Sequence, residues 1–288
     1  MWLLACLLHL GASAVVQDDF IVEVSEDDQN ETIISADDVA MSPELNERYN
    51  FLRKNNSFES RGTSKFKRAI AASNGKLTIE LAIFTDKALF EYVKKRYPDE
   101  THENIDEVIT ELILAIVSSV QLYLNHDSLD QDFQLEIVHM EIADDQPGSD
   151  DLPSNGDIRQ YLDMFCRYQR NRMIAKSLSW DHAMLLTGLD LYTTPDYDKG
   201  SSGMAYLSGM CSREASCTIS EGRSLGSSAL IVAHELAHNL GVDHDGEGPN
   251  SDCDSEDYIM GPKLSPGATR WSACSNRLLN NKCSLDYT

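Results

Sequence analysis

Three histidines and a glutamate stand at the spacing of a mononuclear metal site in the segment HELAHNLGVDHD, residues 234–245. His234 and His238 are four positions apart, so on a helix both imidazoles project from one face and can reach one metal ion. Glu235 lies beside them, where it can accept a proton from a metal-bound water. A lone histidine is more often packed or solvated than a ligand, but the joint pattern predicts a zinc site.

The third ligand in this pattern is His244, which follows a glycine at which the chain can turn back. Gly241 comes three residues after His238, and a helix ends readily at a glycine because that residue adopts the left-handed conformation without steric cost. Three protein nitrogens leave a fourth position for water, which distinguishes a catalytic zinc site from a closed structural one. We therefore expect Zn²⁺ on His234, His238 and His244, with Glu235 as the general base.

These residues predict metal-assisted hydrolysis of peptide bonds, with Glu235 passing the water proton to the leaving nitrogen. One alternative is a catalytically weak or inactive zinc-containing toxin or binding protein on the same fold, against which the intact Glu235 argues. A second is a purely structural metal protein, which would need four protein ligands. The remaining histidines lack this spacing and are expected to be structural: His102, His126, His139 and His182.

A helix must carry the zinc segment, and residues 229–233 supply its apolar body after Ser227 and Ser228, which can cap it. Hydrophobic periodicity predicts further helices over 103–124 and 157–173, and strands over 77–84, 133–142 and 181–191. Helices interleaved with strands indicate an α/β (α+β) layered architecture. The apolar run 112–124 follows an acidic, amphipathic lead-in and is expected to be a buried helix.

Composition divides the 288 residues into three parts. Residues 1–14 are apolar and uncharged, end in small residues and are shorter than the ~20 residues of a membrane span, so we expect a secretory signal peptide. Residues 15–68 are acidic, poor in aromatic residues and end in the basic cluster 65–68, which is typical of a propeptide with a processing site. An ordinary solvated charge run is the alternative for that cluster. Residues 69–288 suit one globular peptidase domain.

The cysteines and the charge bear on compartment and partners. Six cysteines remain once the signal peptide is removed, an even number that fits three disulfides in an oxidising compartment, with free buried thiols as the alternative. We expect a secreted, extracellular monomer without a membrane anchor. They are Cys166, Cys211, Cys217, Cys253, Cys274 and Cys283. The net charge of −23 argues against nucleic acid and anionic membranes as partners. Proteins and peptides are the expected substrates.

The zinc segment resembles the extended motif of the metzincin endopeptidases, and Asp245 resembles the adamalysin (reprolysin) branch of that family. The segment YIMGP, residues 258–262, is similar to the family's methionine turn, and the cysteine placement resembles the group of disintegrin-like metalloproteinases with thrombospondin motifs. The resemblance implies a twisted mixed five-stranded sheet, a long active-site helix and a small C-terminal subdomain. It also implies a substrate-binding edge strand in 203–210 and a specificity pocket walled by 261–275.

Disulfides and a second metal are implied by the same resemblance. The implied pairs are Cys166–Cys217, Cys211–Cys283 and Cys253–Cys274, although six cysteines allow fifteen connectivities. A structural Ca²⁺ is implied on Glu80, Asp181, the Cys283 carbonyl and Asp286, and ordinary surface acids are the alternative reading.

Two departures from the family pattern are visible in the sequence. Residues 15–68 contain no cysteine, so latency through a thiolate on zinc is not expected. The sequence ends five residues after Cys283, and we therefore expect a catalytic domain only.

Overall fold

The computed structural model describes residues 77–144, 152, 155–194, 197–200, 202–210, 212–264 and 267–284. The expected signal peptide (1–14), propeptide (15–68) and processing cluster lie outside these ranges, and so do Cys211 and Asp286. The expected peptidase domain is described from Leu77 onward.

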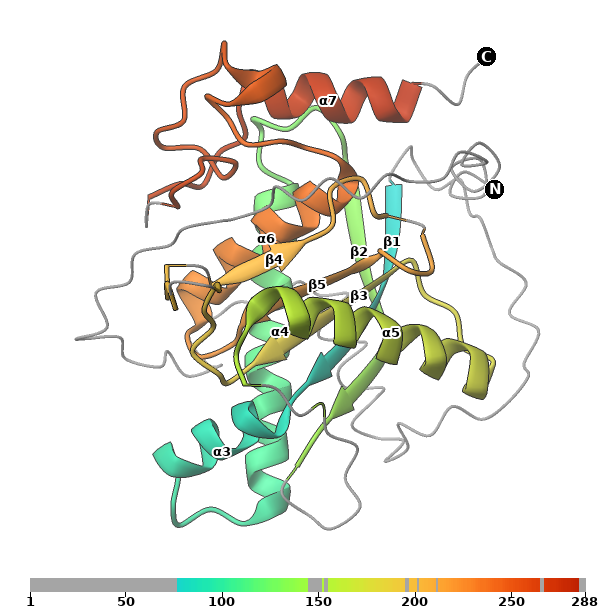
Figure 1. Ribbon diagram of the computed structural model, residues 1–288, viewed down its shortest axis with the longest axis vertical. Helices are drawn as coiled ribbons and strands as arrows, with labels where there is room; N and C mark the ends of the chain where they lie inside the picture. The colour runs from blue at the N-terminus through green and yellow to red at the C-terminus, as the bar shows by residue number, and fades with distance from the viewer. Residues whose placement is uncertain are drawn as a thin grey trace.

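A five-stranded sheet forms the centre of the described chain (Figure 1). The strand order is β2 (Phe133–Ile142), β1 (Leu77–Thr85), β3 (His182–Thr187), β5 (Cys217–Glu221) and β4 (Gly203–Ala205). All neighbours are parallel except β4, which runs antiparallel to β5 at one edge. The mixed five-stranded sheet expected from the family resemblance is confirmed.

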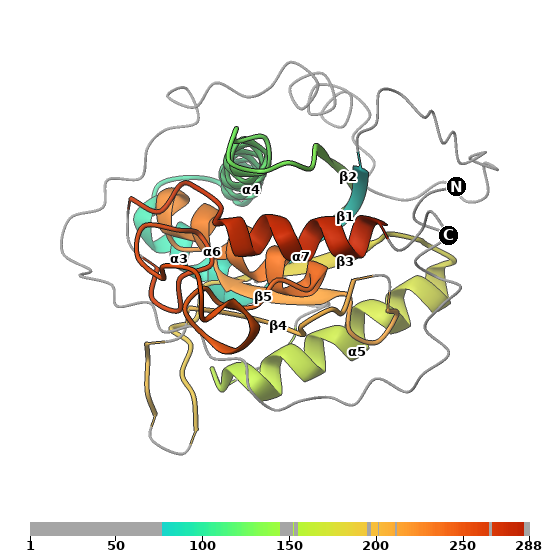
Figure 2. The ribbon, with the colours of Figure 1, turned by 90° about the horizontal axis from the view of Figure 1, so that it is seen from above.

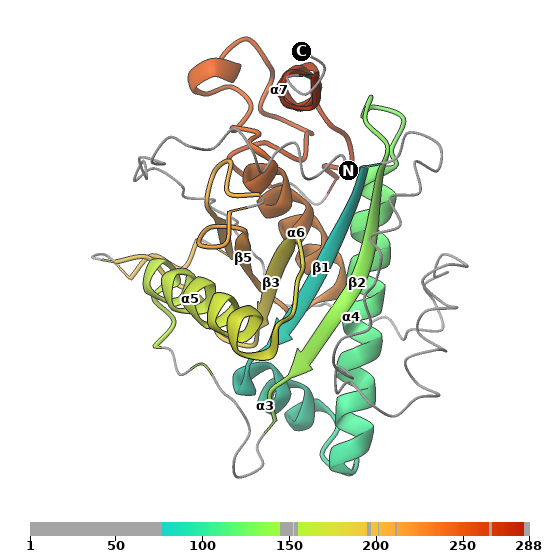
Figure 3. The ribbon, with the colours of Figure 1, turned by 90° about the vertical axis from the view of Figure 1, so that its right-hand side faces the viewer.

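Helices cover both faces of this sheet (Figure 3). One core joins the sheet to α3 (Lys87–Arg96), α4 (His102–Leu124) and α6 (Leu225–Leu240), and a second core joins the opposite face to α5 (Ile158–Lys176). Among the described helices, α4 is long and apolar enough to cross a membrane. Its apolar residues nevertheless pack in the first core against α6 and β2, as expected for a buried helix.

Several elements differ from the sequence prediction. The strand expected over 181–191 ends at Thr187, where the pairing with β5 stops and the next N–H, that of Gly188, donates to the buried Asp86 side chain at 3.1 Å. Helix α6 begins one turn earlier than expected, with Ser224 at the N-cap position, where its side chain makes no capping hydrogen bond. Ser228 lies inside the helix and its hydroxyl donates to the Glu221 carbonyl, 2.7 Å away, so it binds the preceding strand.

A C-terminal part follows α6 and lies beyond one end of the sheet (Figure 1, Figure 2). It contains the short helix η2 (Gly248–Asn250) and α7 (Ala273–Ser284). Trp271 fastens it to the main body, because its indole N–H donates to the Tyr123 carbonyl at 2.8 Å. This part corresponds to the small subdomain that the resemblance implies.

Two of the three implied disulfides are present. Cys166–Cys217 joins α5 to β5, and Cys253–Cys274 joins the loop after η2 to the start of α7. The third implied pair stays a prediction, because Cys211 lies outside the described residues.

Candidate metal centre

Helix α6 and the loop that follows it bring the three predicted histidines together. Gly241 ends the helix at φ 97°, in the left-handed conformation expected from its position. The chain then reverses, and the Nε2 atom of His244 lies 3.1 Å from that of His234 and 3.1 Å from that of His238. Three nitrogens this close fit one Zn²⁺, whose bonds to histidine are about 2.0–2.1 Å long.

Backbone carbonyls fix the orientation of two of these rings. The Nδ1 of His234 donates to the Ile259 carbonyl at 2.6 Å, and the Nδ1 of His238 donates to the Val242 carbonyl at 2.7 Å. A carbonyl only accepts, so the proton resides on Nδ1 and the Nε2 lone pair is left to face a metal. The residue just before the methionine turn's Met260 thus orients a ring in the zinc helix.

Burial keeps the three imidazoles neutral. Desolvation, followed by repulsion from the other two rings, holds the pKa of His234 well below its usual range. Desolvation likewise lowers the pKa of His238 to about 3 and lowers that of His244. Neutral imidazole is the form that binds a metal, so these side chains need not lose a proton at neutral pH.

Glu235 is buried beside the histidines, with 1% of its surface exposed. Neither carboxylate oxygen has a hydrogen-bond donor among the described residues, and desolvation raises its pKa well above the usual range. A buried carboxylate without a donor is costly, and a metal-bound water is the kind of donor that would satisfy it. The donor set and this buried acid therefore fit a zinc-bound water.

The edge strand β4 packs directly against Glu235. A Cβ on Gly203 would lie 2.9 Å from Oε1 of Glu235 and 2.5 Å from Cγ2 of Ile231. Only glycine allows this approach without a shift of the helix or the strand. The sequence places Gly203 in a substrate-binding strand, but the contact joins residues far apart in the chain and carries no local signal.

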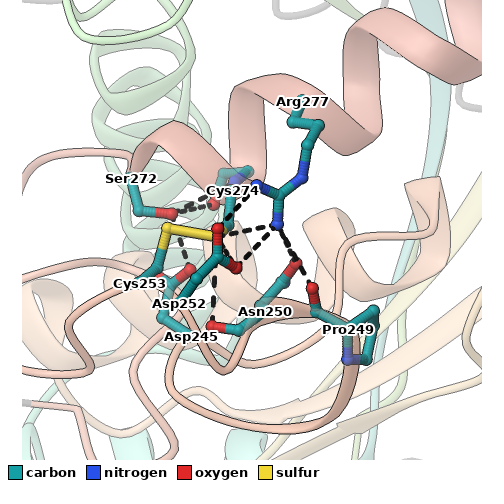
Figure 4. A network of polar contacts seen from close by, with 9 residues as sticks. Asp245, Pro249, Asn250, Asp252, Cys253, Ser272, Cys274 and Arg277 are labelled. Atoms are coloured by element: carbon teal, nitrogen blue, oxygen red, sulfur yellow. Dashed lines mark hydrogen bonds and ion pairs between the residues drawn. A yellow bond between two sulfur atoms is a disulfide. The ribbon is translucent and has the colours of Figure 1, made fainter.

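Asp245 links the third histidine to the C-terminal part. It is fully buried, its N–H donates to the Met260 carbonyl at 2.8 Å, and its Oδ1 accepts from the Ser272 hydroxyl at 2.6 Å. Desolvation is the largest cause that raises the pKa of Asp245, to about 6. Figure 4 shows this contact beside the Cys253–Cys274 disulfide. In the sequence Asp245 marks only the family branch, because its partners Met260 and Ser272 are distant along the chain and give no local signal.

The implied calcium ligands are brought together only in part. The Glu80 N–H donates to Oδ2 of Asp181 at 3.0 Å, and the Asp181 N–H donates to the Glu80 carbonyl at 2.9 Å. Cys283 lies in α7, and Asp286 lies outside the described residues. Calcium therefore stays a prediction.

Comparison with known proteins decides the family. The family model described as "Reprolysin (M12B) family zinc metalloprotease" matches residues 78–284. The chain belongs to the reprolysin family. Its position in that family agrees with the metal centre, because reprolysins are zinc metalloproteases and the three converging histidines fit a zinc site.

Relatives of this reprolysin chain carry the thrombospondin-motif name. It is 32% identical over 210 residues to "A disintegrin and metalloproteinase with thrombospondin motifs adt-1" of Caenorhabditis elegans, covering 71% of this chain and 14% of the relative. The chain is 34% identical over 227 residues to "A disintegrin and metalloproteinase with thrombospondin motifs 16" of Mus musculus. That match covers 77% of this chain and 17% of the relative. The reprolysin chain thus spans less than a fifth of the length of either relative.

Proposed function

We propose that this reprolysin is a secreted endopeptidase that hydrolyses peptide bonds of extracellular proteins. In this proposal His234, His238 and His244 hold Zn²⁺, and Glu235 is the general base. One observation supports it most strongly. The Nε2 atom of His244 lies 3.1 Å from that of His234 and 3.1 Å from that of His238, and the buried Glu235 carboxylate beside them has no hydrogen-bond donor among the described residues.

The chemistry divides between the metal and the chain. When bound, Zn²⁺ supplies a Lewis acid that activates water and polarises the scissile carbonyl. The Glu235 carboxylate accepts the proton of the attacking water and delivers it to the leaving nitrogen. The Ile259 and Val242 carbonyls hold the imidazoles in the tautomer that binds the metal.

The sheet edge beside the metal centre suits an extended substrate. Strand β4 ends the strand order and pairs with β5 on one side. Its other side can receive a peptide by strand addition, in which main-chain hydrogen bonds give affinity. Gly203 in this strand packs on Glu235, so a peptide bound along β4 would pass close to the general base.

The remaining domain predictions belong to the same proposal. Residues 1–14 would direct the chain into the secretory pathway and then be removed, and cleavage after Arg68 would release the peptidase domain 69–288. The two disulfides support an oxidising compartment. A structural Ca²⁺ near Glu80 and Asp181 is also part of the proposal, and latency without a thiolate follows from the absence of cysteine in 15–68.

The test is the isosteric variant Glu235→Gln in the processed 69–288 form. We expect it to retain one zinc per chain, measured by mass spectrometry of the metal, and to lose at least about 10²-fold in casein hydrolysis, which is typical for removal of a general base. The exposed Glu256→Gln is the matched control and should cleave normally. A Glu235→Gln protein that cleaves at the wild-type rate would refute the proposal.

A further inference from the structure

Asn239, the residue after the zinc ligand His238, connects α6 to the segment that follows β4. Its side-chain nitrogen donates to the Tyr206 carbonyl at 3.0 Å and to the Ala215 carbonyl at 2.8 Å. Both amide hydrogens are therefore used. The approach requires glycine at position 209, because a Cβ on Gly209 would lie 2.5 Å from the Asn239 nitrogen and 2.2 Å from the Ala215 carbonyl oxygen.

Two backbone hydrogen bonds reinforce this connection. The Ser208 N–H donates to the His238 carbonyl at 2.9 Å, and the Met210 N–H donates to the Asn239 carbonyl at 2.9 Å. Tyr206, whose carbonyl Asn239 holds, directly follows the last residue of β4. The segment that follows β4 is thus hydrogen-bonded to the zinc ligand His238 and to the next residue, Asn239.

His182, in the central strand β3, holds the other end of the Asn239 side chain. Its Nδ1 lies 3.1 Å from the Asn239 Oδ1, and its Nε2 lies 3.1 Å from the Thr218 hydroxyl. Because both Asn239 hydrogens are committed, Oδ1 must accept, and so His182 carries its proton on Nδ1. Nε2 then accepts from Thr218. All three side chains are 1% exposed or less.

We propose that His182 is a positioning residue that, through Asn239, holds the substrate-binding edge strand in register with the zinc helix. The proposal rests on the proposed peptidase function and goes beyond it, since the hydrogen bonds of His182 go to Asn239 and Thr218 and act on the metal centre only through Asn239. A hydrogen bond from Nδ1 fixes which way the Asn239 amide faces, and that orientation presents both N–H groups to the carbonyls after β4. Without this donor, the Asn239 Oδ1 keeps only the Ser216 hydroxyl, 3.5 Å away, so the amide is held less firmly and the segment after β4 is fixed mainly by its backbone hydrogen bonds.

Two neutral amides separate this role from simple packing. In His182→Asn the side-chain nitrogen takes the place of Nδ1 and can still donate to Asn239. In His182→Gln it takes the place of Nε2 and faces Thr218 instead. Each zinc-loaded variant is assayed with a peptide long enough to lie along β4 and with a short peptide that spans little beyond the scissile bond.

We expect His182→Gln to raise KM for the long peptide about fivefold or more, the effect of one lost buried hydrogen bond. Its kcat, and its turnover of the short peptide, should stay within about twofold of wild type. His182→Asn should restore the wild-type KM. A purely structural role would instead lower the fraction of active enzyme and so reduce the cleavage rates of both peptides by the same factor. That result, or the same KM in both variants, overturns the proposal.

Two controls keep the result decisive. If wild-type protein shows no chelator-sensitive cleavage, the proposed function fails, and not the role of His182 alone. If His182→Gln does not fold, ¹⁵N NMR of the wild-type zinc protein tests the proposal by determining which ring nitrogen of His182 carries the proton. A proton on Nδ1 of His182 supports the proposal, and a neutral ring protonated on Nε2 overturns it.

Discussion

At the scale of single residues, local spacing predicted the metal-binding side chains but not their supports. His234 and His238 share a helix face, so their convergence follows from the helical repeat. The carbonyl that orients His234 belongs to Ile259, twenty-five residues later. The glycine that packs against Glu235 is Gly203, which lies in strand β4. Such contacts depend on tertiary packing, which has no short-range signature in the sequence.

Gly203→Ala tests the close packing of β4 on the general base. The added methyl would meet Ile231 and Glu235 at 2.5 and 2.9 Å, so helix or strand must shift. We expect a loss of about 1–3 kcal/mol in the free energy of unfolding, together with a fall in kcat/KM. Gly226→Ala, in the first turn of α6 with open space around its Cβ position, is the control and should stabilise slightly. Equal effects of the two substitutions would contradict this packing.

Acid stability tests the neutral state of His182. Desolvation lowers its pKa to about 4 from 6.5, against the smaller opposite effect of its bond to Asn239. Between these values the unfolded chain binds more protons than the folded one, so stability rises with pH and is lost as pH falls from about 6.5 to about 4. The contribution is on the order of 3 kcal/mol.

The measurement compares urea unfolding of wild type and His182→Asn at pH 7 and pH 4.5, both in chelator. The variant should show the shallower loss, because it removes one of the buried histidines that resist protonation. Identical pH slopes in the two proteins would contradict a neutral, buried His182.

At the scale of elements, the helices and strands with a clear hydrophobic periodicity were predicted, whereas a helix with a mostly polar sequence was not. The expected strand 133–142 matches β2, and the expected helix 103–124 matches α4 within one residue. Helix α7 was missed, because its sequence ACSNRLLNNKCS is mostly polar. Hydrogen bonds from Asn276 and Asn280 to the loop after α4, together with a disulfide, hold it in place.

The two disulfides should differ in their effect on metal binding. Cys253–Cys274 closes a 21-residue separation next to Ser272, whose hydroxyl binds the Asp245 carboxylate beside His244. Replacing both cysteines by serine should cost about 3 kcal/mol of stability and weaken zinc binding. The same change at Cys166–Cys217, which joins α5 to β5, should lower stability without changing zinc affinity. Zinc titration with a competing chelator distinguishes them, and equal affinities in the two variants would argue against this coupling.

At the scale of the whole molecule, the metal centre lies where the layered body meets the C-terminal part. Helix α6 belongs to the core on one face of the sheet, whereas His244 belongs to the loop that leads to α7. Zinc would therefore join the two parts, and a ligand that binds only the folded chain stabilises it by mass action. The alternation of helices and strands predicted the layered class, but the position of this junction became clear only from the structure.

The most direct measurement is cleavage of a protein substrate by the processed 69–288 form, before and after removal of zinc with a chelator. The account predicts that cleavage disappears with the metal, returns in proportion to zinc added back, and reaches its maximum at one zinc per chain. Undiminished cleavage by protein shown to be free of metal would contradict it.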